Sequence, residues 1–285
     1  MRLKEVLRDK FTEEELKLVP TSFEVIGSKG KSVAIVEIPE ELKSKEGLIA
    51  EAIMKMQKSV KSVLKKVSGR KGDFRLREFE LIGGEADTEV VHKEYGYVLK
   101  LDPQKVYFSS REATERQRIA EQVKKNEKVL VMFSGIAPIP IAIAKKQPEV
   151  EKIYAIELNP EAHKYAEENV RINKLSHKIV LINGDVRDVA RKYFGMFDRV
   201  IMPLPFGAES FIDIAVECLK KEGGIIHFYC QGEGKDVYSS ALKTIKENTE
   251  KLNREVKILD KRRVLQHAPD KWKVCIDFKA GEKNG

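Results

Sequence analysis

Four short segments of the sequence hold residues that could bind a nucleoside, and each comes after an apolar run. Ser134–Pro138 follows VLVMF, Glu157 ends KIYAIE, Asp185 comes soon after KIVLI, and Pro203 and Pro205 follow RVIM. A carboxylate about twenty residues beyond a small-residue turn is the expected partner of ribose hydroxyls. Asp185 can accept a hydrogen bond from the exocyclic amine of adenine. The pattern predicts a cofactor that carries adenosine.

Each of these features also has a purely structural explanation. Glu157 could cap a helix that begins near Pro160, Asp185 could be a turn residue, and the prolines could simply end a strand. Their recurrence in one order, at successive strand ends, favours a nucleoside site. The sequence contains no GxxxxGK[ST] motif, which argues against a nucleoside triphosphatase.

The elements that position these residues form βαβ units. From Lys105 onward, apolar runs of four to seven residues alternate with helical stretches, which is typical of a parallel sheet covered on both faces. Ligands bind such sheets at the carboxyl ends of the strands. A helix is expected over 110–125, and two final strands around HAPDK are expected to form an antiparallel pair that closes the sheet edge. Residues 105–285 are predicted to form a Rossmann-like domain.

The first 104 residues are predicted to form a smaller α+β domain. Helical spacing and alternating apolar positions distinguish its elements. The expected helices are 3–17 and 47–56, and the expected strands are 23–27, 33–38, 60–67, 74–82, 88–93 and 97–102.

A basic segment lies within this smaller domain. Residues 58–77 contain eight lysines and arginines against the single acid Asp73, whereas the whole chain has a net charge of +8. A solvated protein face normally mixes both signs, and a one-sign segment that includes arginine suits a phosphate backbone. We expect two strands joined by the turn Ser68–Asp73 to bind a polyanion.

Composition excludes several other classes of protein. The 285 residues are 42% hydrophobic and 34% charged, which indicates a globular chain, and no apolar run approaches the roughly 18–20 residues of a membrane helix. Cys218, Cys230 and Cys275 form no Cys-x-x-Cys pair and are expected to be buried packing residues in a reducing cytoplasm. The five histidines lie on different elements, so no metal site is expected, and His227 is interpreted as a core histidine whose hydrogen bonds are satisfied.

Beyond these patterns, the sequence resembles the archaeal and eukaryotic tRNA guanosine-37 N1-methyltransferases, which are class I S-adenosylmethionine enzymes. The resemblance runs from about Phe23 to Phe278. The motifs that carry it are VKSVLKKVS, VYFSSREATERQRIAE, YAIELNPEA, ENVRINKL, GDVRDV, DRVIMPLP, GGIIHFYC and HAPDKWKVCIDF. The resemblance implies a Rossmann-like methyltransferase domain with a smaller N-terminal α+β domain that binds RNA.

The resemblance also assigns roles to individual residues. It implies that Glu157 holds the ribose of S-adenosylmethionine, that Asp185 holds the adenine amine, and that Phe133, Gly135, Leu158, Val186 and Pro203 complete the cofactor site. Glu115 matches the family's general base for the guanine N1 proton, although an ion pair on the helix surface also explains it. Arg75, or Arg77 on the same strand face, matches an arginine that stabilises O6, and Pro203 lies in the turn that positions the base. The expected RNA-binding residues are Lys65, Lys66, Arg70, Lys71, Arg75, Arg77, Arg111 and Arg116.

Three positions depart from the family pattern. Val131 replaces an aspartate, Ala137 a glycine, and Pro203 an asparagine, so the cofactor turn and base recognition differ here. Two alternatives therefore stay open: a wybutosine-pathway aminocarboxypropyl transferase acting on tRNA, and a tRNA-binding protein that has lost catalysis. The expected protein is a cytoplasmic monomer that binds tRNA and needs neither a membrane nor a protein partner.

Overall fold

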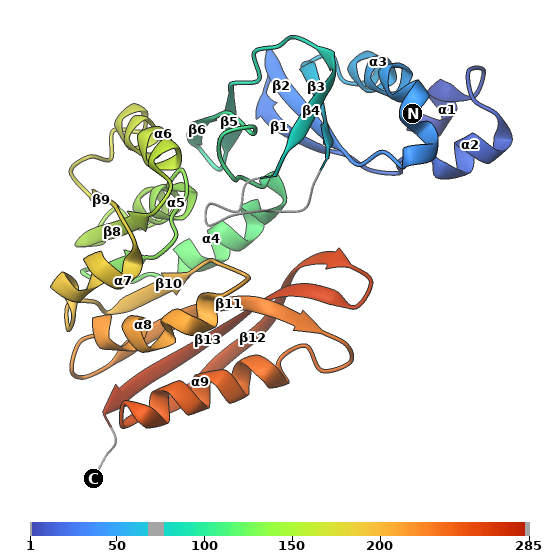
Figure 1. Cartoon of the computed structure of the whole chain (residues 1–285). Coiled ribbons are helices and arrows are strands. Elements are labelled where there is room, and N and C mark those ends of the chain that lie inside the picture. Colours follow the sequence, from blue (N-terminus) through green and yellow to red (C-terminus); the bar gives the residue numbers. More distant parts are fainter. Residues whose placement is uncertain (1, 68–76, 283–285) are drawn as a thin grey trace. The chain divides into compact units, whose positions relative to one another are not determined.

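The chain folds into two compact units, whose elements are labelled in Figure 1. The computed structural model describes residues 2–67 and 77–282, and the chain divides between Arg111 and Glu112. The sequence analysis placed the division after residue 104, but the first unit also includes the segment that follows its last strand. Among the described residues, no helix is both long and apolar enough to cross a membrane.

The first unit is an α+β fold built on a four-stranded sheet of order β1-β2-β3-β4. Strands β2 and β3 are parallel, and the outer pairs are antiparallel. Helix α3 connects the parallel strands and packs Ile49 and Ile53 into an apolar core with Val63. A separate antiparallel pair, β5-β6, turns at Tyr95 and Gly96. The bounds are β1 (Glu24–Ser28), β2 (Lys31–Val36), α3 (Glu46–Met56), β3 (Val60–Lys66), β4 (Phe79–Gly84), β5 (Val90–Glu94) and β6 (Tyr97–Leu101).

The expectation of one helix over 3–17 was wrong, because two helices occupy this stretch. They are α1 (Leu3–Leu7) and α2 (Glu13–Leu18). Thr12 begins the second helix: its side chain accepts the Glu15 N–H over 3.3 Å, and the Glu15 carboxylate accepts the Thr12 N–H over 2.8 Å. This reciprocal capping box stabilises a helix start at Thr12, so a single continuous helix is interrupted there.

The second unit contains a seven-stranded, mostly parallel sheet of order β12-β13-β11-β10-β7-β8-β9. The five strands from β11 to β9 are parallel, and β13 runs antiparallel to both of its neighbours. Chain order reverses between β7 and β10, so their carboxyl ends form the switch point where ligands bind such sheets. The strand bounds are β7 (Lys128–Val131), β8 (Lys152–Glu157), β9 (Ile179–Asn183), β10 (Arg199–Met202), β11 (Gly224–Glu233), β12 (Arg254–Ala268) and β13 (Lys271–Glu282).

Helices cover both faces of this sheet, and Figure 1 shows α8 and α9 on one side of it. The predicted helix over 110–125 is shorter than expected: a 3-10 turn at Ser110–Glu112 precedes α4, which ends at Gln122. The helix bounds are α4 (Ala113–Gln122), α5 (Pro138–Lys146), α6 (Pro160–Ile172), α7 (Val186–Val189), α8 (Ile212–Cys218) and α9 (Ser239–Lys251).

The two faces of β10, β11 and β13 differ in polarity, because successive side chains on a strand point to opposite faces. One face packs against α8 and α9 in an apolar core that includes Val200, Met202, Ile226, Phe228, Val274 and Ile276. The intervening residues Arg199, His227 and Asp277 are buried on the other face, where α4 supplies their polar partners. The alternation thus places a buried polar layer between the sheet and α4.

The final two strands pair antiparallel, as the sequence predicted. Strand β13 joins the sheet beside β11, and β12 forms the outer edge. Residues 257–263 of β12 are exposed on both faces of this edge.

Candidate active site

Glu157 ends β8, and its carboxylate links two neighbouring strand ends. The N–H of Gly135, in the turn after β7, donates to Oε2 over 2.6 Å, and the N–H of Asn159 donates to Oε1 over 2.8 Å. Burial raises the pKa of the Glu157 carboxyl, and these N–H groups oppose the rise. Helix α6 is capped by the Asn159 side chain, which accepts from the N–H of Glu161, so helix capping does not explain Glu157.

The turn after β7 has an unusual backbone. Phe133 and Ala137 both adopt left-handed conformations, with φ of 54° and 66°. The ring of Phe133 packs edge-on against Phe211 at 4.9 Å between centroids. Between them in sequence, the hydroxyl of Ser134 is buried and has no hydrogen-bond partner among the described residues. A buried polar atom without a partner in such a turn suits a ligand that supplies one.

Asp185 follows β9 and begins α7. Its Oδ1 accepts the N–H of Arg187 over 2.8 Å, while Oδ2 lies 3.4 Å from the Arg187 guanidinium, and the side chain is 30% exposed. The structural explanation of Asp185 as a helix cap therefore holds, and the partial exposure also leaves it accessible to a ligand. Two other residues that were expected to bind the cofactor differ in exposure: Val186 is buried and Leu158 is 39% exposed.

Pro203 follows β10 at the switch point. Pro203 and Leu204 are half-buried, and Pro205 is buried. Because a proline has neither an N–H nor a polar side chain, this turn offers fewer hydrogen bonds to a base than an asparagine does. The polar groups that remain in this turn are its backbone carbonyl groups.

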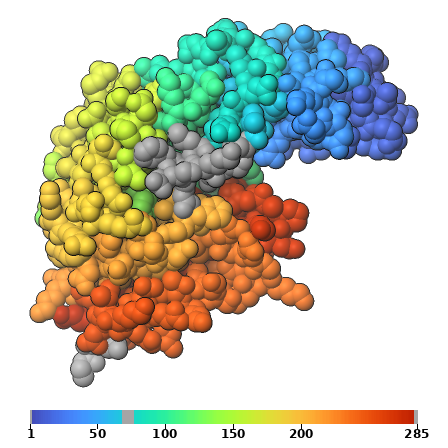
Figure 2. All heavy atoms as spheres, viewed as in Figure 1, coloured from blue at the N-terminus to red at the C-terminus, as the bar shows by residue number. Residues whose placement is uncertain are grey.

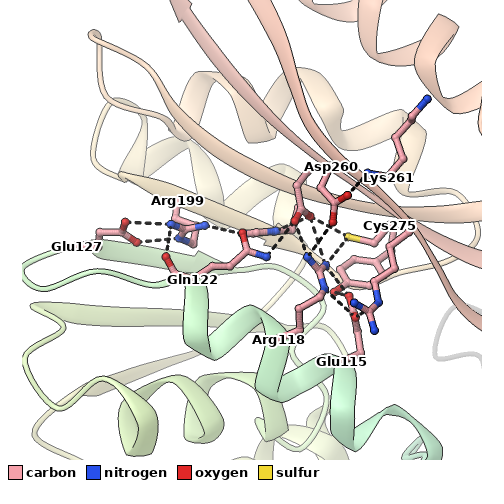
Figure 3. A network of polar contacts seen from close by, with 12 residues as sticks. Glu115, Arg118, Gln122, Glu127, Arg199, Asp260, Lys261 and Cys275 are labelled. Carbon is pink, nitrogen blue, oxygen red and sulfur yellow. Dashed lines mark hydrogen bonds and ion pairs between the residues drawn. The ribbon is translucent and has the colours of Figure 1, made fainter.

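A second group of polar residues surrounds Glu115 on α4, and Figure 3 shows it pointing toward Arg118 one turn further along the helix. Arg118 Nη2 donates to Oε1 over 2.7 Å, and Nε donates to Oε2 over 2.9 Å. The buried Tyr229 hydroxyl donates to Oε1 over 2.6 Å. Burial, with Cys275 and Glu115 nearby, raises the pKa of Tyr229 well above its ordinary value, so this hydroxyl stays a donor. Glu115 is 7% exposed, so a surface ion pair does not describe it.

The strand register places this group at the ligand-binding edge of the sheet. Met202, the last residue of β10, pairs with Phe228 on β11. Tyr229 is the next residue, so it lies level with Pro203, just beyond the end of β10. Glu115 is therefore held beside the same carboxyl edge that carries the turns after β7 and β10.

Behind Glu115 the polar contacts continue into the core. Arg118 Nη1 donates to Asp277 Oδ2 over 2.6 Å, and Asp277 Oδ1 lies 2.7 Å from Nδ1 of His227. Although burial opposes it, the hydrogen bonds from His227 and Arg118 hold the pKa of Asp277 well below its ordinary value. Arg199 lies 2.7 Å from Nε2 of His227 and also pairs with Glu127.

His227 is a buried core histidine with both ring nitrogens in contact, as the sequence analysis interpreted it. Because arginine can only donate, Nε2 accepts from Arg199 and Nδ1 carries the proton toward Asp277. Burial lowers the pKa of His227 despite Asp277, so the ring is held neutral.

His227, Cys275 and Asp277 together have the ligand types of a metal site, with their donor atoms within 4.8 Å of one another. No metal site was expected from the sequence, because the histidines lie on different elements, but the fold brings Asp277 to His227 from fifty residues away. Arg118 and Arg199 already contact these donor atoms. Two guanidinium groups at this distance disfavour the addition of a metal cation. The three cysteines are buried and free, and burial raises the pKa of Cys218 and Cys230 to about 12.

Among the cations expected to bind RNA, the described ones on β3 already contact carboxylates. Lys65 is 9% exposed and lies 2.6 Å from Glu46 and 2.7 Å from Glu80, and these hydrogen bonds raise its pKa. Lys66 lies 2.7 Å from Glu37, which also pairs with Arg77 at 3.7 Å. The charges of Lys65 and Lys66 are therefore already balanced in part by these carboxylates.

The remaining expected cations differ in exposure. Arg111 is exposed, whereas Arg116 is buried on α4. Arg70, Lys71 and Arg75, together with the turn between the two basic strands, lie outside the described residues. Strands β3 and β4 on either side of that segment do pair antiparallel.

Sequence reasoning did not identify Arg118, Tyr229 and Arg262, which contact Glu115, or Asp277, which holds Arg118 from behind; Arg262 Nε lies 3.5 Å from Glu115 Oε2. The spacing of Glu115 and Arg118, three residues apart on a helix, was a usable signal, because such residues are neighbours on a helix surface. Tyr229 and Asp277 are more than a hundred residues away from Glu115, and no local pattern connects them.

Comparisons with known protein families match almost the whole chain. Residues 90–259 match the TRM5/TYW2 methyltransferase domain, and residues 3–88 match the TYW2 N-terminal domain. One relative, the tRNA (guanine(37)-N(1))-methyltransferase Trm5b of Pyrococcus abyssi, is 42% identical over 94% of this chain and 77% of its own length.

Another relative carries a different activity in its name. The tRNA(Phe) (4-demethylwyosine(37)-C(7)) aminocarboxypropyltransferase of Pyrococcus horikoshii is 32% identical over 98% of this chain and 96% of its own length. The crystal structure of P. horikoshii TYW2 in complex with MeSAdo has a TM-score of 0.81 at 30% identity, and the match covers 99% of this chain and 98% of that one.

Proposed function

Because the chain belongs to the TRM5/TYW2 methyltransferase family, we propose that it methylates N1 of the guanosine at position 37 of tRNA. It is an S-adenosylmethionine-dependent tRNA methyltransferase. The finer assignment, to N1 and to position 37, is supported by the likeness to Trm5b and by the surroundings of Glu115.

The residues at the strand ends fit S-adenosylmethionine. The cofactor supplies a methyl group bound to a positively charged sulfur. Glu157 lies where a carboxylate accepts hydrogen bonds from the ribose hydroxyls, and Asp185 lies at the next strand end for the adenine amine. In the turn after β7, we assign two groups to the cofactor: the Ser134 hydroxyl, which has no hydrogen-bond partner among the described residues, and the half-buried Gly135.

Glu115 has the chemistry of a general base. Guanine N1 becomes nucleophilic only as its proton leaves, so a carboxylate within hydrogen-bond reach is needed. Among the described residues, Oε1 accepts hydrogen bonds from Arg118 and Tyr229, whereas Oε2 accepts one, from Arg118 Nε, and lies 3.5 Å from Arg262 Nε. Oε2 therefore has room for the proton of N1, and the other contacts fix the direction in which it faces.

The cations of the first unit supply the contacts to tRNA in this proposal. Lys66, Arg77 and Arg111 are the described candidates for phosphate contacts, with Arg70, Lys71 and Arg75 in the adjoining segment. Arg75, or Arg77, is assigned to O6 of the guanine because it matches the family's arginine. Lys65 and Arg116 are buried, so we assign each of them to supporting the fold of its own unit.

One observation carries the proposal: a buried carboxylate, fixed by Arg118 and Tyr229, at the edge of the sheet that also carries Glu157. The test is to incubate the protein with S-adenosylmethionine and unmodified tRNA, digest the RNA, and measure nucleoside masses. A guanosine heavier by one methyl group supports the proposal. Bound tRNA without modification indicates a protein that has lost catalysis.

A second candidate is aminocarboxypropyl transfer to tRNA. Two observations favour it: residues 3–88 match the TYW2 N-terminal domain, and Pro203 replaces the asparagine expected of the methyl-transfer branch. The same mass measurement separates the two reactions, with tRNA carrying 4-demethylwyosine as the alternative substrate. An aminocarboxypropyl adduct on that tRNA would assign the chain to the second reaction.

A further inference from the structure

Arg262 on the edge strand β12 faces Glu115. It pairs with Cys275 on β13, so both side chains lie on the face of the sheet that α4 covers. Its two neighbours point to the opposite face: Lys261 lies over the ring of Tyr238, and Arg263 lies over the ring of Trp272. Of these three consecutive cations, Arg262 alone is directed toward α4.

The contact between Arg262 and Glu115 is long and partly solvated. Arg262 Nε lies 3.5 Å from Glu115 Oε2, the oxygen that has room for a proton, and the Arg262 side chain is 47% exposed. Arg118, in contrast, is 13% exposed and is also held by Asp277. Exposed ion pairs are weak, whereas breaking a buried one leaves an uncompensated charge. Arg262 can therefore leave Glu115 at little cost, and Arg118 cannot.

The segment that carries Arg262 is accessible to a large substrate. Residues 257–263 are exposed, and Figure 2 shows the C-terminal hairpin, toward the red end of the scale, at the molecular surface. A guanine placed against Glu115 Oε2 therefore meets the Arg262 guanidinium as well.

We propose that Arg262 is a catalytic residue that transfers its ion pair from Glu115 to the guanine as the guanine loses its proton. This rests on the proposed function of Glu115. In the step, the N1–H bond breaks, the proton joins Glu115 Oε2, and the electron pair stays on the guanine, shared between N1 and O6. Glu115 becomes neutral as the guanine becomes negative, so the guanidinium of Arg262 loses one anionic partner and gains another. The total charge around Arg262 is unchanged. The Arg262 guanidinium is a hydrogen-bond donor directed at the guanine, so it stabilises the negative charge that develops there.

The experiment compares Arg262→Ala and Arg262→Lys with Arg254→Ala. Arg254 is an arginine on the same strand, and its guanidinium donates to the Lys221 carbonyl over 2.8 Å, away from Glu115. For each variant, one measures the affinity for tRNA and the single-turnover rate of methyl transfer at saturating tRNA. We expect Arg262→Ala to lower the saturated rate roughly 100-fold, the scale of losing one donor to a developing charge. Its tRNA affinity should change little, Arg262→Lys should recover part of the rate, and Arg254→Ala should match the unaltered protein.

Added guanidinium ion gives a second readout. It should partly restore the rate of Arg262→Ala, because it can occupy the vacated position, and a variant damaged only in its fold would not respond. A weaker tRNA affinity with an unchanged saturated rate would show that Arg262 binds a phosphate and would overturn the proposal. An unchanged rate and affinity would overturn it as well. If the unaltered protein forms no 1-methylguanosine, the proposed function fails first, and that outcome is distinct from both.

Discussion

The guanidinium of Arg118 bridges Glu115 and Asp277. It donates hydrogen bonds to both carboxylate oxygens of Glu115, over 2.7 and 2.9 Å, and to Asp277 Oδ2 over 2.6 Å. It thereby connects a helix to a strand that lies far away in sequence. The arrangement fixes the orientation of Glu115 and gives the first prediction.

Glu115→Gln should lower the single-turnover rate of methyl transfer by roughly 100-fold or more, the usual scale for losing a general base. The affinity for S-adenosylmethionine should stay nearly intact, because Glu157 and Asp185 lie on other elements. Glu121→Gln is the matched control: Glu121 is on the same helix and pairs with Lys146 at the surface. An unchanged rate for Glu115→Gln would remove Glu115 from the mechanism.

Asp277→Asn should destabilise the protein by about 3–5 kcal/mol, because it removes one partner of a buried ion pair and leaves the other charge uncompensated. Asp277 is 2% exposed. Asp260→Asn is the control: this carboxylate lies 3.9 Å from the same Arg118 but is 58% exposed, and its removal should cost only about 0–1 kcal/mol. Urea unfolding measures both. Equal losses in the free energy of unfolding for the two variants would contradict the claim that Asp277 compensates a buried charge.

Ala137→Gly should stabilise the protein by about 0.5–1 kcal/mol, because a left-handed residue with a Cβ costs roughly 1–2 kcal/mol and glycine loses part of that gain to its chain entropy. Ala137 has a φ of 66° just before α5. Ala142→Gly, the same change inside α5, should destabilise by about 1 kcal/mol or more. A loss of stability in both variants would show that Ala137 is not strained.

The free energy of unfolding should fall as the pH drops below about 6.5, and His227 should cause part of that fall. Burial lowers the pKa of folded His227 below the unfolded value of 6.5. The unfolded chain then takes up a proton first, and stability is lost at up to about 1.4 kcal/mol per pH unit until the folded pKa is reached. His227→Gln should reduce this slope between pH 7 and pH 5.5, as measured by urea unfolding at a series of pH values. An equal slope in the variant and the unaltered protein would refute the assignment.

Much of the fold follows from local sequence, and much of the site does not. The apolar runs identified the parallel strands, and they also placed Glu157 and Asp185 at the ends of neighbouring strands, because both signals are local. The capping box at Thr12 also has a local signal, since threonine precedes glutamate by three residues. The helical spacing on either side of Thr12 nevertheless favoured one continuous helix. His227 and Asp277 meet only because β11 and β13 are neighbours, and sequence spacing does not give strand order.

The central claim, methylation of N1 at position 37, is tested most directly with two tRNA transcripts that differ only at that position. One has guanosine at 37 and the other has adenosine. After incubation with the protein and S-adenosylmethionine, the RNA is digested and its nucleosides are separated. Their retention times and masses are then compared with those of authentic 1-methylguanosine. The account predicts 1-methylguanosine from the first transcript and none from the second. Equal methylation of both transcripts, or an aminocarboxypropyl adduct in place of the methyl group, would contradict it.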